Sequence, residues 1–158
     1  MSSYKVAFIG GGNMGRALIG GLVRRGTPPQ AIRVGEPGEA VRRALERDFG
    51  CLVAADNDTP VRGADAVVIA VKPQEAARVV KALGPRLREQ RSLVLSVAAG
   101  IEIRSLESWC GEGVPVVRAM PNRPALVGAG ATGLYASARA DAAARSLAED
   151  IMRSVGAV

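Results

Sequence analysis

Short apolar blocks recur along the chain, and each ends at glycine, proline or a polar turn. Their apolar positions are continuous rather than alternating, which is typical of strands buried on both faces of a parallel sheet. The clearest blocks are Val6–Ile9, Ile32–Val34, Ala66–Val71, Leu93–Leu95 and Val114–Val117.

Segments with helical spacing lie between these blocks. They are Met14–Arg25, Glu39–Phe49, Glu75–Leu83 and Ile103–Trp109. Alternating strands and helices predict an α/β protein with a mostly parallel sheet and helices on both faces. Because crossovers between parallel strands are right-handed, few topologies remain, and the doubly wound, Rossmann-like fold is the simplest.

The last third of the chain has a different pattern. Met120–Pro124 predicts a rigid turn, and Ala131–Tyr135 predicts one more strand, for which an antiparallel direction is an option. Ala140–Val155 predicts a helix, because its larger apolar residues recur four apart on one face. Without a repeat or a linker, residues 1–158 are expected to form one domain.

Composition excludes several kinds of chemistry. With 48% hydrophobic residues among 158, the chain is not expected to be disordered. Because it has no histidine, it cannot build a Ser-His-Asp triad, a Cys-His pair or a His-ligated zinc site. Cys51 and Cys110 stand alone in the sequence, so we expect free thiols and no metal site.

Two further patterns bear on location and partners. We do not expect Met1–Lys5 to begin a signal peptide, because Gly10–Gly12 interrupts the first apolar stretch well before membrane-spanning length. A cytoplasmic protein without a membrane partner is therefore expected. The net charge of +6 includes a basic run between Arg78 and Arg91. A solvated helix surface is favoured over a nucleic-acid site, because aromatic residues make up only 3% of the chain and none lies in this run.

Gly10–Gly15 fits the pattern G-x-G-x-x-G and has the sequence context that this pattern requires. It follows a predicted strand, opens a predicted helix, and precedes by about 20 residues an acid, Glu36, at the end of the next strand. Gly10 permits a tight turn, Gly12 lets backbone approach a pyrophosphate, and Gly15 lets helix and strand pack closely. The sequence therefore predicts a dinucleotide site, with a ligand-free glycine turn as the alternative.

Glu36 bears on the choice of cofactor. A carboxylate at this position accepts the ribose hydroxyls of NAD and repels a 2′-phosphate, which favours NADH over NADPH. Arg33, Arg42 and Arg43 lie near enough in the sequence to offset that repulsion. An exposed carboxylate near a helix start is the plainer alternative for Glu36.

Three loops follow predicted strands at the edge where a doubly wound sheet binds ligands. They are Ala70–Pro73, Ser96–Gly100 and Arg118–Asn122. Each alone is compatible with ordinary turn chemistry, but together with the glycine motif they predict a crevice.

In this order the segments Phe8–Gly15, Ala70–Pro73, Ser96–Gly100 and Val117–Asn122 resemble pyrroline-5-carboxylate reductase, with Met120-Pro-Asn122 as the most distinctive part. The resemblance runs from about Lys5 to Val158. It implies reduction of 1-pyrroline-5-carboxylate to L-proline, the last step of proline biosynthesis, with hydride from NADPH or NADH. The residues expected at the cofactor are Ile9, Gly10, Gly11, Gly12, Asn13, Met14, Gly15, Glu36, Asn57, Ala70, Val71, Lys72, Pro73, Ala98, Ala99 and Asn122.

The chain departs from the family pattern in two ways. Arg123 stands where the family usually has threonine, and the family continues into a helical domain that pairs subunits and supplies most of the substrate pocket. The resemblance therefore implies a cofactor domain that binds nucleotide with little turnover, a homo-oligomer in the longer form, and no catalytic residue that can be named here.

The missing histidine fits an imine substrate better than a carbonyl, since a protonated imine already carries its proton. Two alternatives stay open: a Rossmann reductase of other specificity, such as a hydroxyacid dehydrogenase or a deazaflavin-linked NADP reductase, and a non-catalytic nucleotide-sensing or nucleic-acid-binding module.

Overall fold

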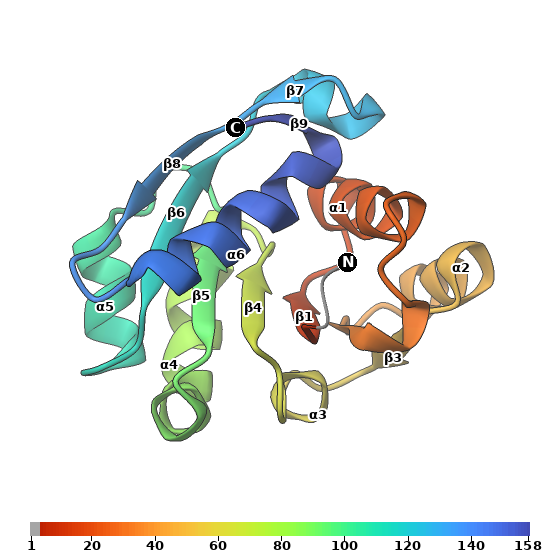
Figure 1. Cartoon of the computed structure of the whole chain (residues 1–158). Helices are drawn as coiled ribbons and strands as arrows, with labels where there is room; N and C mark the ends of the chain where they lie inside the picture. The colour runs from red at the N-terminus through yellow and green to blue at the C-terminus, as the bar shows by residue number, and fades with distance from the viewer. Residues whose placement is uncertain (1–3) are drawn as a thin grey trace.

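A seven-stranded sheet organises residues 4–158, which are the residues described by the computed structural model (Figure 1). Its spatial order is β3-β2-β1-β4-β5-β6-β8, and all neighbours are parallel except β6 and β8. The strands are β1 (Val6–Ile9), β2 (Ile32–Gly35), β3 (Leu52–Ala54), β4 (Ala66–Ile69), β5 (Leu93–Ser96), β6 (Val116–Met120) and β8 (Gly133–Ala136). The predicted doubly wound sheet is confirmed, as is the antiparallel option for the late strand.

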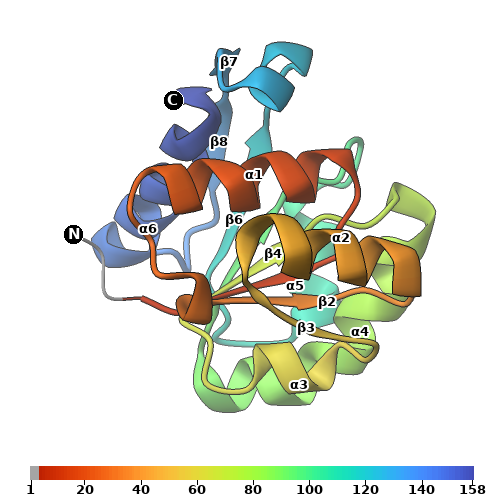
Figure 2. The same ribbon diagram turned by 90° about the vertical axis from the view of Figure 1, so that its right-hand side faces the viewer.

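Helices cover both faces of the sheet, as predicted (Figure 2). One face packs against α1 (Asn13–Arg24), α2 (Glu39–Phe49) and α6 (Ala142–Met152). The other face packs against α3 (Asp58–Val61), α4 (Pro73–Gln90) and α5 (Ile103–Cys110). The strand residues alternate between the two cores: Val6 and Phe8 face α1, whereas Ala7 and Ile9 face the α4 side. Burial on both sides explains why the central strands read as continuous apolar blocks.

Some elements differ from the expectation. β3 and α3 were not predicted, because β3 is a short edge strand with a half-exposed Leu52 and α3 has only four residues. α4 extends to Gln90 rather than Leu83, and the exposed Pro85 lies inside the helix without ending it.

The end of the chain also divides differently. The helix expected over Ala140–Val155 ends at Met152 and continues as the 3-10 turn η3 (Arg153–Val155). β9 (Gly156–Ala157) then pairs in parallel with β7 (Gly130–Ala131). Two further 3-10 turns are η1 (Pro29–Ala31) and η2 (Arg123–Val127).

None of the helices in residues 4–158 is both long enough and apolar enough to cross a membrane. The first three residues, which belong to the segment not expected to begin a signal peptide, lie outside the described part of the chain.

Both cysteines are buried and neither is in a disulfide. Cys51 packs under α2 and its Sγ faces the carbonyl of Leu45 at 3.7 Å, while Cys110 ends α5. Desolvation raises the pKa of Cys51 and raises that of Cys110 to about 12. Since the thiolate is the reactive form, both thiols are inert in the folded protein.

We therefore expect neither thiol to react with Ellman's reagent at mildly alkaline pH while the chain is folded. Both react in guanidinium chloride, because unfolding exposes the thiols and returns their pKa values to the ordinary range. A fast reaction of either thiol under native conditions would contradict this assignment.

Candidate functional site

A cleft of about 470 Å³ opens at the carboxyl ends of β1, β2 and β4. The chain leaves β1 toward β2 and β3 and then returns to β4, so this is the point where the strand order reverses. Ligands of doubly wound sheets bind at such switch points. Predicted site residues that line the cleft are Ile9, Gly10, Gly12, Glu36, Asn57, Ala70, Val71 and Lys72.

At the first and last glycines of the glycine-rich loop, neighbouring backbone atoms approach very closely. Gly10 has a φ of +99°, and a Cβ there would lie 2.6 Å from the carbonyl oxygen of Ala70. A Cβ at Gly15 would lie 2.6 Å from the carbonyl oxygen of Gly10. Side chains at either position would separate α1 from β1 and β4, so these glycines have the structural roles that the motif predicts.

Gly12 has a different environment. A Cβ added there would meet no atom of the described protein within 4 Å, although Gly12 lies in the cleft wall. Gly12 is also the N-cap residue of α1, and no side chain caps this helix. The open space therefore lies against the positive end of a 12-residue helix, an arrangement that fits a pyrophosphate.

Glu36 follows β2 and reaches across to the glycine-rich loop. Its Oε1 accepts a hydrogen bond from the Gly11 N–H at 2.9 Å, and its Oε2 accepts one from the Gly38 N–H at 2.8 Å. Arg42 donates from Nη1 to the carbonyls of Glu36 and Pro37 and is not ion-paired with Glu36. The acid is thus present in the cleft, with both carboxylate oxygens already hydrogen-bonded.

Asn57 reaches the same cleft from the start of α3. β2 passes so close that a Cβ at Gly35 would lie 2.6 Å from Asn57 Oδ1. The neighbouring Asp56 accepts the N–H of Thr59 at 2.8 Å, and this hydrogen bond lowers the pKa of the Asp56 carboxyl. An ionised Asp56 and a half-buried Asn57 therefore lie together on the Glu36 side of the cleft.

The segment after β4 forms the opposite wall. Lys72 is the N-cap residue of α4 and Pro73 is its first residue, where a missing N–H costs no helical hydrogen bond. Within residues 4–158, the side-chain ammonium group of Lys72 has neither a hydrogen bond nor an ion pair, so its charge is free to meet an anion. Glu75 and Arg78 of α4, which are ion-paired with each other, also line this wall.

The other predicted residues lie outside the lining of this cleft. Ala98 is buried and its N–H faces Ser96 Oγ at 3.3 Å, whereas Ala99 is exposed in the loop after β5. Asn122 holds its own turn, since its Oδ1 accepts the N–H of Ala131 at 2.9 Å, and Arg123 is exposed. Four more predicted residues are near lining residues in the sequence without lining the cleft themselves: Gly11, Met14, Gly15 and Pro73. Asn13 lines a separate groove along α1.

Several lining residues were not predicted. They are Gly35, Pro37, Ala55, Asp56, Glu75, Arg78 and Val79. The sequence does hold a signal for some of them: residues that follow a parallel strand lie at the ligand edge, and Gly35 and Pro37 flank Glu36 at the end of β2. Asp56 and Ala55 were missed because β3, which they follow, was not predicted.

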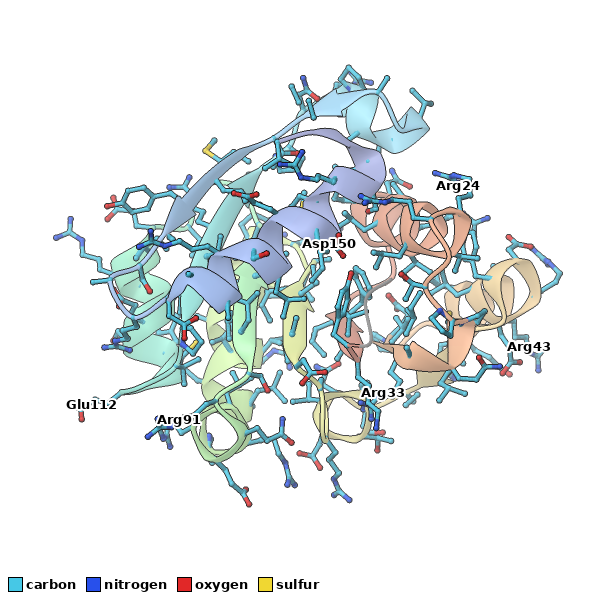
Figure 3. All side chains as sticks on the ribbon, in the orientation of Figure 1. Arg24, Arg33, Arg43, Arg91, Glu112 and Asp150 are labelled. Carbon is cyan, nitrogen blue, oxygen red and sulfur yellow. The ribbon has the colours of Figure 1, made fainter. Side chains whose placement is uncertain are left out.

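The basic run on α4 is mostly engaged within the protein. Its internal partners are Glu75 for Arg78, Asp58 and Glu89 for Arg86, and the carbonyl of Cys110 for Arg88. Arg91, like Arg43 and Glu112, lies at the periphery of the molecule (Figure 3). The described chain contains no group of three residues able to hold a metal ion.

Comparison with known proteins places the chain in a family. Residues 5–100 match the sequence profile described as "NADP oxidoreductase coenzyme F420-dependent". The chain belongs to this family. The chain is also similar over nearly its whole length to pyrroline-5-carboxylate reductases. It is 46% identical to that of Pseudomonas aeruginosa over 156 residues, which are 99% of this chain and 57% of the relative.

Solved structures of pyrroline-5-carboxylate reductases are similar to the chain as well. A pyrroline-5-carboxylate reductase from Coxiella burnetii superposes with a TM-score of 0.97 at 39% identity, covering 99% of this chain and 58% of that one. The Plasmodium falciparum enzyme, solved with NADP bound, has a TM-score of 0.86 at 27% identity, with coverages of 99% and 57%. The chain thus spans a little over half the length of these three relatives.

We expect alanine to have different effects at Gly12, which faces open space, and at Gly10, which is closely packed. Gly12→Ala should change the free energy of unfolding by less than about 1 kcal/mol, because its methyl group meets no protein atom. It should weaken binding of NADH, used as a probe, by about tenfold or more, because the methyl group occupies the open cradle. Gly10→Ala should instead destabilise the fold by about 1–3 kcal/mol.

Thermal unfolding and fluorescence titration of NADH separate these effects. If Gly12→Ala bound NADH like the unchanged chain, the cradle would not be the pyrophosphate site.

Proposed function

We propose that this chain is the cofactor-binding domain, residues 1–158, of an enzyme that reduces 1-pyrroline-5-carboxylate to L-proline with NADH or NADPH. The observation that carries the proposal is the 46% identity over 99% of the chain to a pyrroline-5-carboxylate reductase, on a fold whose switch-point cleft contains the glycine-rich loop. Such a reaction is the last step of proline biosynthesis.

Different residues of the cleft contact different parts of the cofactor. The open cradle at Gly12 and the first turn of α1 hold the pyrophosphate, and Glu36 with Asn57 lies at the adenosine ribose. Ala70, Val71 and Lys72 line the side toward the nicotinamide, together with the loop that holds Ala98 and Ala99. When bound, the dinucleotide supplies the hydride.

The chain's part in the chemistry is binding and orientation rather than proton transfer. Hydride addition to a C=N bond that is already protonated needs no separate acid at the reacting nitrogen, which suits a chain without histidine. We place the substrate pocket mainly in the region by which the relatives exceed this chain in length, so this chain alone binds cofactor with little or no turnover.

The family description supports a second candidate, a deazaflavin-linked NADP oxidoreductase. The whole-length similarity to pyrroline-5-carboxylate reductases favours the first. Coenzyme F420 in place of pyrroline-5-carboxylate, in the assay below, distinguishes the two.

Partners and location follow from the same proposal. We propose a small-molecule substrate, no nucleic-acid partner, a homo-oligomer for the longer form, and a cytoplasmic setting. Internal pairing of Arg78, Arg86 and Arg88 supports the absence of a nucleic-acid partner, because few basic groups of the run are left for phosphates.

To test the reaction, we would compare the 158-residue chain with a fusion to the residues that follow the matched region in the Pseudomonas aeruginosa relative. We expect both proteins to bind NADH by fluorescence titration. Only the fusion should oxidise NADH when pyrroline-5-carboxylate is added, because the substrate pocket lies mainly in the added region.

The Pseudomonas aeruginosa enzyme, assayed under the same conditions, serves as the control. A fusion that binds NADH but shows no rate above background beside the active control would contradict the proposed reaction. Absence of nucleotide binding by the 158-residue chain would contradict the cofactor site itself.

For cofactor choice we propose a preference for NADH. Glu36 places a carboxylate in the cleft, where it repels a 2′-phosphate, and Arg42 is engaged with two backbone carbonyls on the same turn. Parallel titrations should therefore give a lower Kd for NADH than for NADPH. Tighter binding of NADPH would show that Arg42 or its neighbours outweigh Glu36.

A further inference from the structure

The carboxylate of Glu36 joins two loops that are far apart in the sequence. Gly11 belongs to the loop between β1 and α1, and Gly38 is the N-cap residue of α2. Glu36 accepts the N–H of the first at 2.9 Å and of the second at 2.8 Å, one on each oxygen. No other side chain in the described chain accepts a hydrogen bond from either of these N–H groups.

The backbone on both sides of this bridge is closely packed. A Cβ at Gly11 would lie 2.7 Å from Leu45 Cδ1, and one at Gly38 would lie 3.2 Å from Glu36 Oε2. The turn is also fixed from its backbone, because Arg42 donates to the carbonyls of Glu36 at 2.9 Å and of Pro37 at 2.8 Å. The carboxylate is therefore half-buried between the two loops, on a turn whose backbone Arg42 holds.

We infer that Glu36 is a positioning residue, which fixes the glycine-rich loop in the conformation that binds a pyrophosphate. This inference rests on the proposed function only for the identity of the ligand. Glycine-rich backbone loses much conformational freedom when it is ordered, so a loop fixed in advance binds an anion with less entropic cost. Hydrogen bonds to a charged acceptor are the stronger kind and suit this purpose.

Because of this bridge, the neighbouring residues Gly11 and Gly12 have different roles. The Gly11 N–H points to Glu36 and is unavailable to a phosphate, whereas Gly12 faces the open cradle. Loss of the carboxylate consequently weakens binding of a dinucleotide even when its adenosine ribose offers no hydroxyl to Glu36. Direct recognition of the ribose alone has no such consequence.

The first test measures hydrogen exchange of the Gly11 and Gly38 amides by NMR without ligand. Glu36→Ala should speed exchange at both by about tenfold or more. Glu36→Gln keeps one acceptor oxygen. At one of the two amides it should therefore give an exchange rate between those of the unchanged chain and Glu36→Ala. Glu39→Ala, which removes an exposed acid on α2 ion-paired with Arg43, is the matched control and should change neither.

Exchange of core amides such as Val67 should stay unchanged in all variants, which separates a local effect from global destabilisation. Unchanged exchange at Gly11 and Gly38 in Glu36→Ala would overturn the inference. Because no nucleotide is present, this result does not depend on the proposed function.

The second test uses NADH and an NADH analogue whose adenosine ribose lacks the 2′ and 3′ hydroxyls. If Glu36 is a positioning residue, Glu36→Ala should weaken the binding of both ligands, by about tenfold for the analogue. Glu36→Gln should give Kd values between those of Glu36→Ala and the unchanged chain. Equal binding of the analogue by Glu36→Ala and the unchanged chain, with NADH weakened, would assign Glu36 to ribose recognition alone. Failure of the unchanged chain to bind either ligand would count against the proposed function, leaving the exchange result to decide the inference.

Discussion

The close approach of three backbone segments at the switch point is the constraint on which the site depends. The turn after β1 passes so near β4 that a Cβ at Gly10 would come within 2.6 Å of the Ala70 carbonyl. The first turn of α1 then packs equally close to the Gly10 carbonyl through Gly15. Since carbonyl oxygens of adjacent strands cannot move aside, glycine at both positions is required for the helix to begin over the cleft.

Sequence patterning predicted the central sheet well because its strands are buried on both faces. Every residue is buried in two of these strands, Val6–Ile9 and Ala66–Ile69. Their uniformly apolar composition therefore identifies them as strands. Peripheral elements were missed for the complementary reason. β3 is an edge strand with Leu52 half exposed, and β9 has only two residues, so tertiary pairing rather than local sequence forms them.

The site was predictable in its motif and less so in its hydrogen bonding. The spacing from Gly15 to Glu36 correctly brought the acid into the same cleft as the glycine-rich loop. The direction of its two oxygens toward Gly11 and Gly38 depends on the path of the turn after β2, which no spacing rule contains. Likewise, the motif that predicts Asn122 at the cofactor does not contain its hydrogen bond with the Ala131 N–H, which depends on the position of β7. The role of Asn122 at the cofactor stays a prediction.

Helix α1 is in close contact with backbone toward its C-terminal end as well as at its first turn. A Cβ at Gly21 would lie 2.3 Å from the carbonyl oxygen of Ser154 in η3, so the last turns of the helix rest directly on backbone. Gly15 makes the corresponding contact at the other end. Close backbone contacts near both ends restrict movement of the helix relative to the sheet. The orientation of the amides that face the cleft is therefore set jointly by β1 and by the last residues before β9, which makes the C-terminal segment part of the frame of a site that it does not touch.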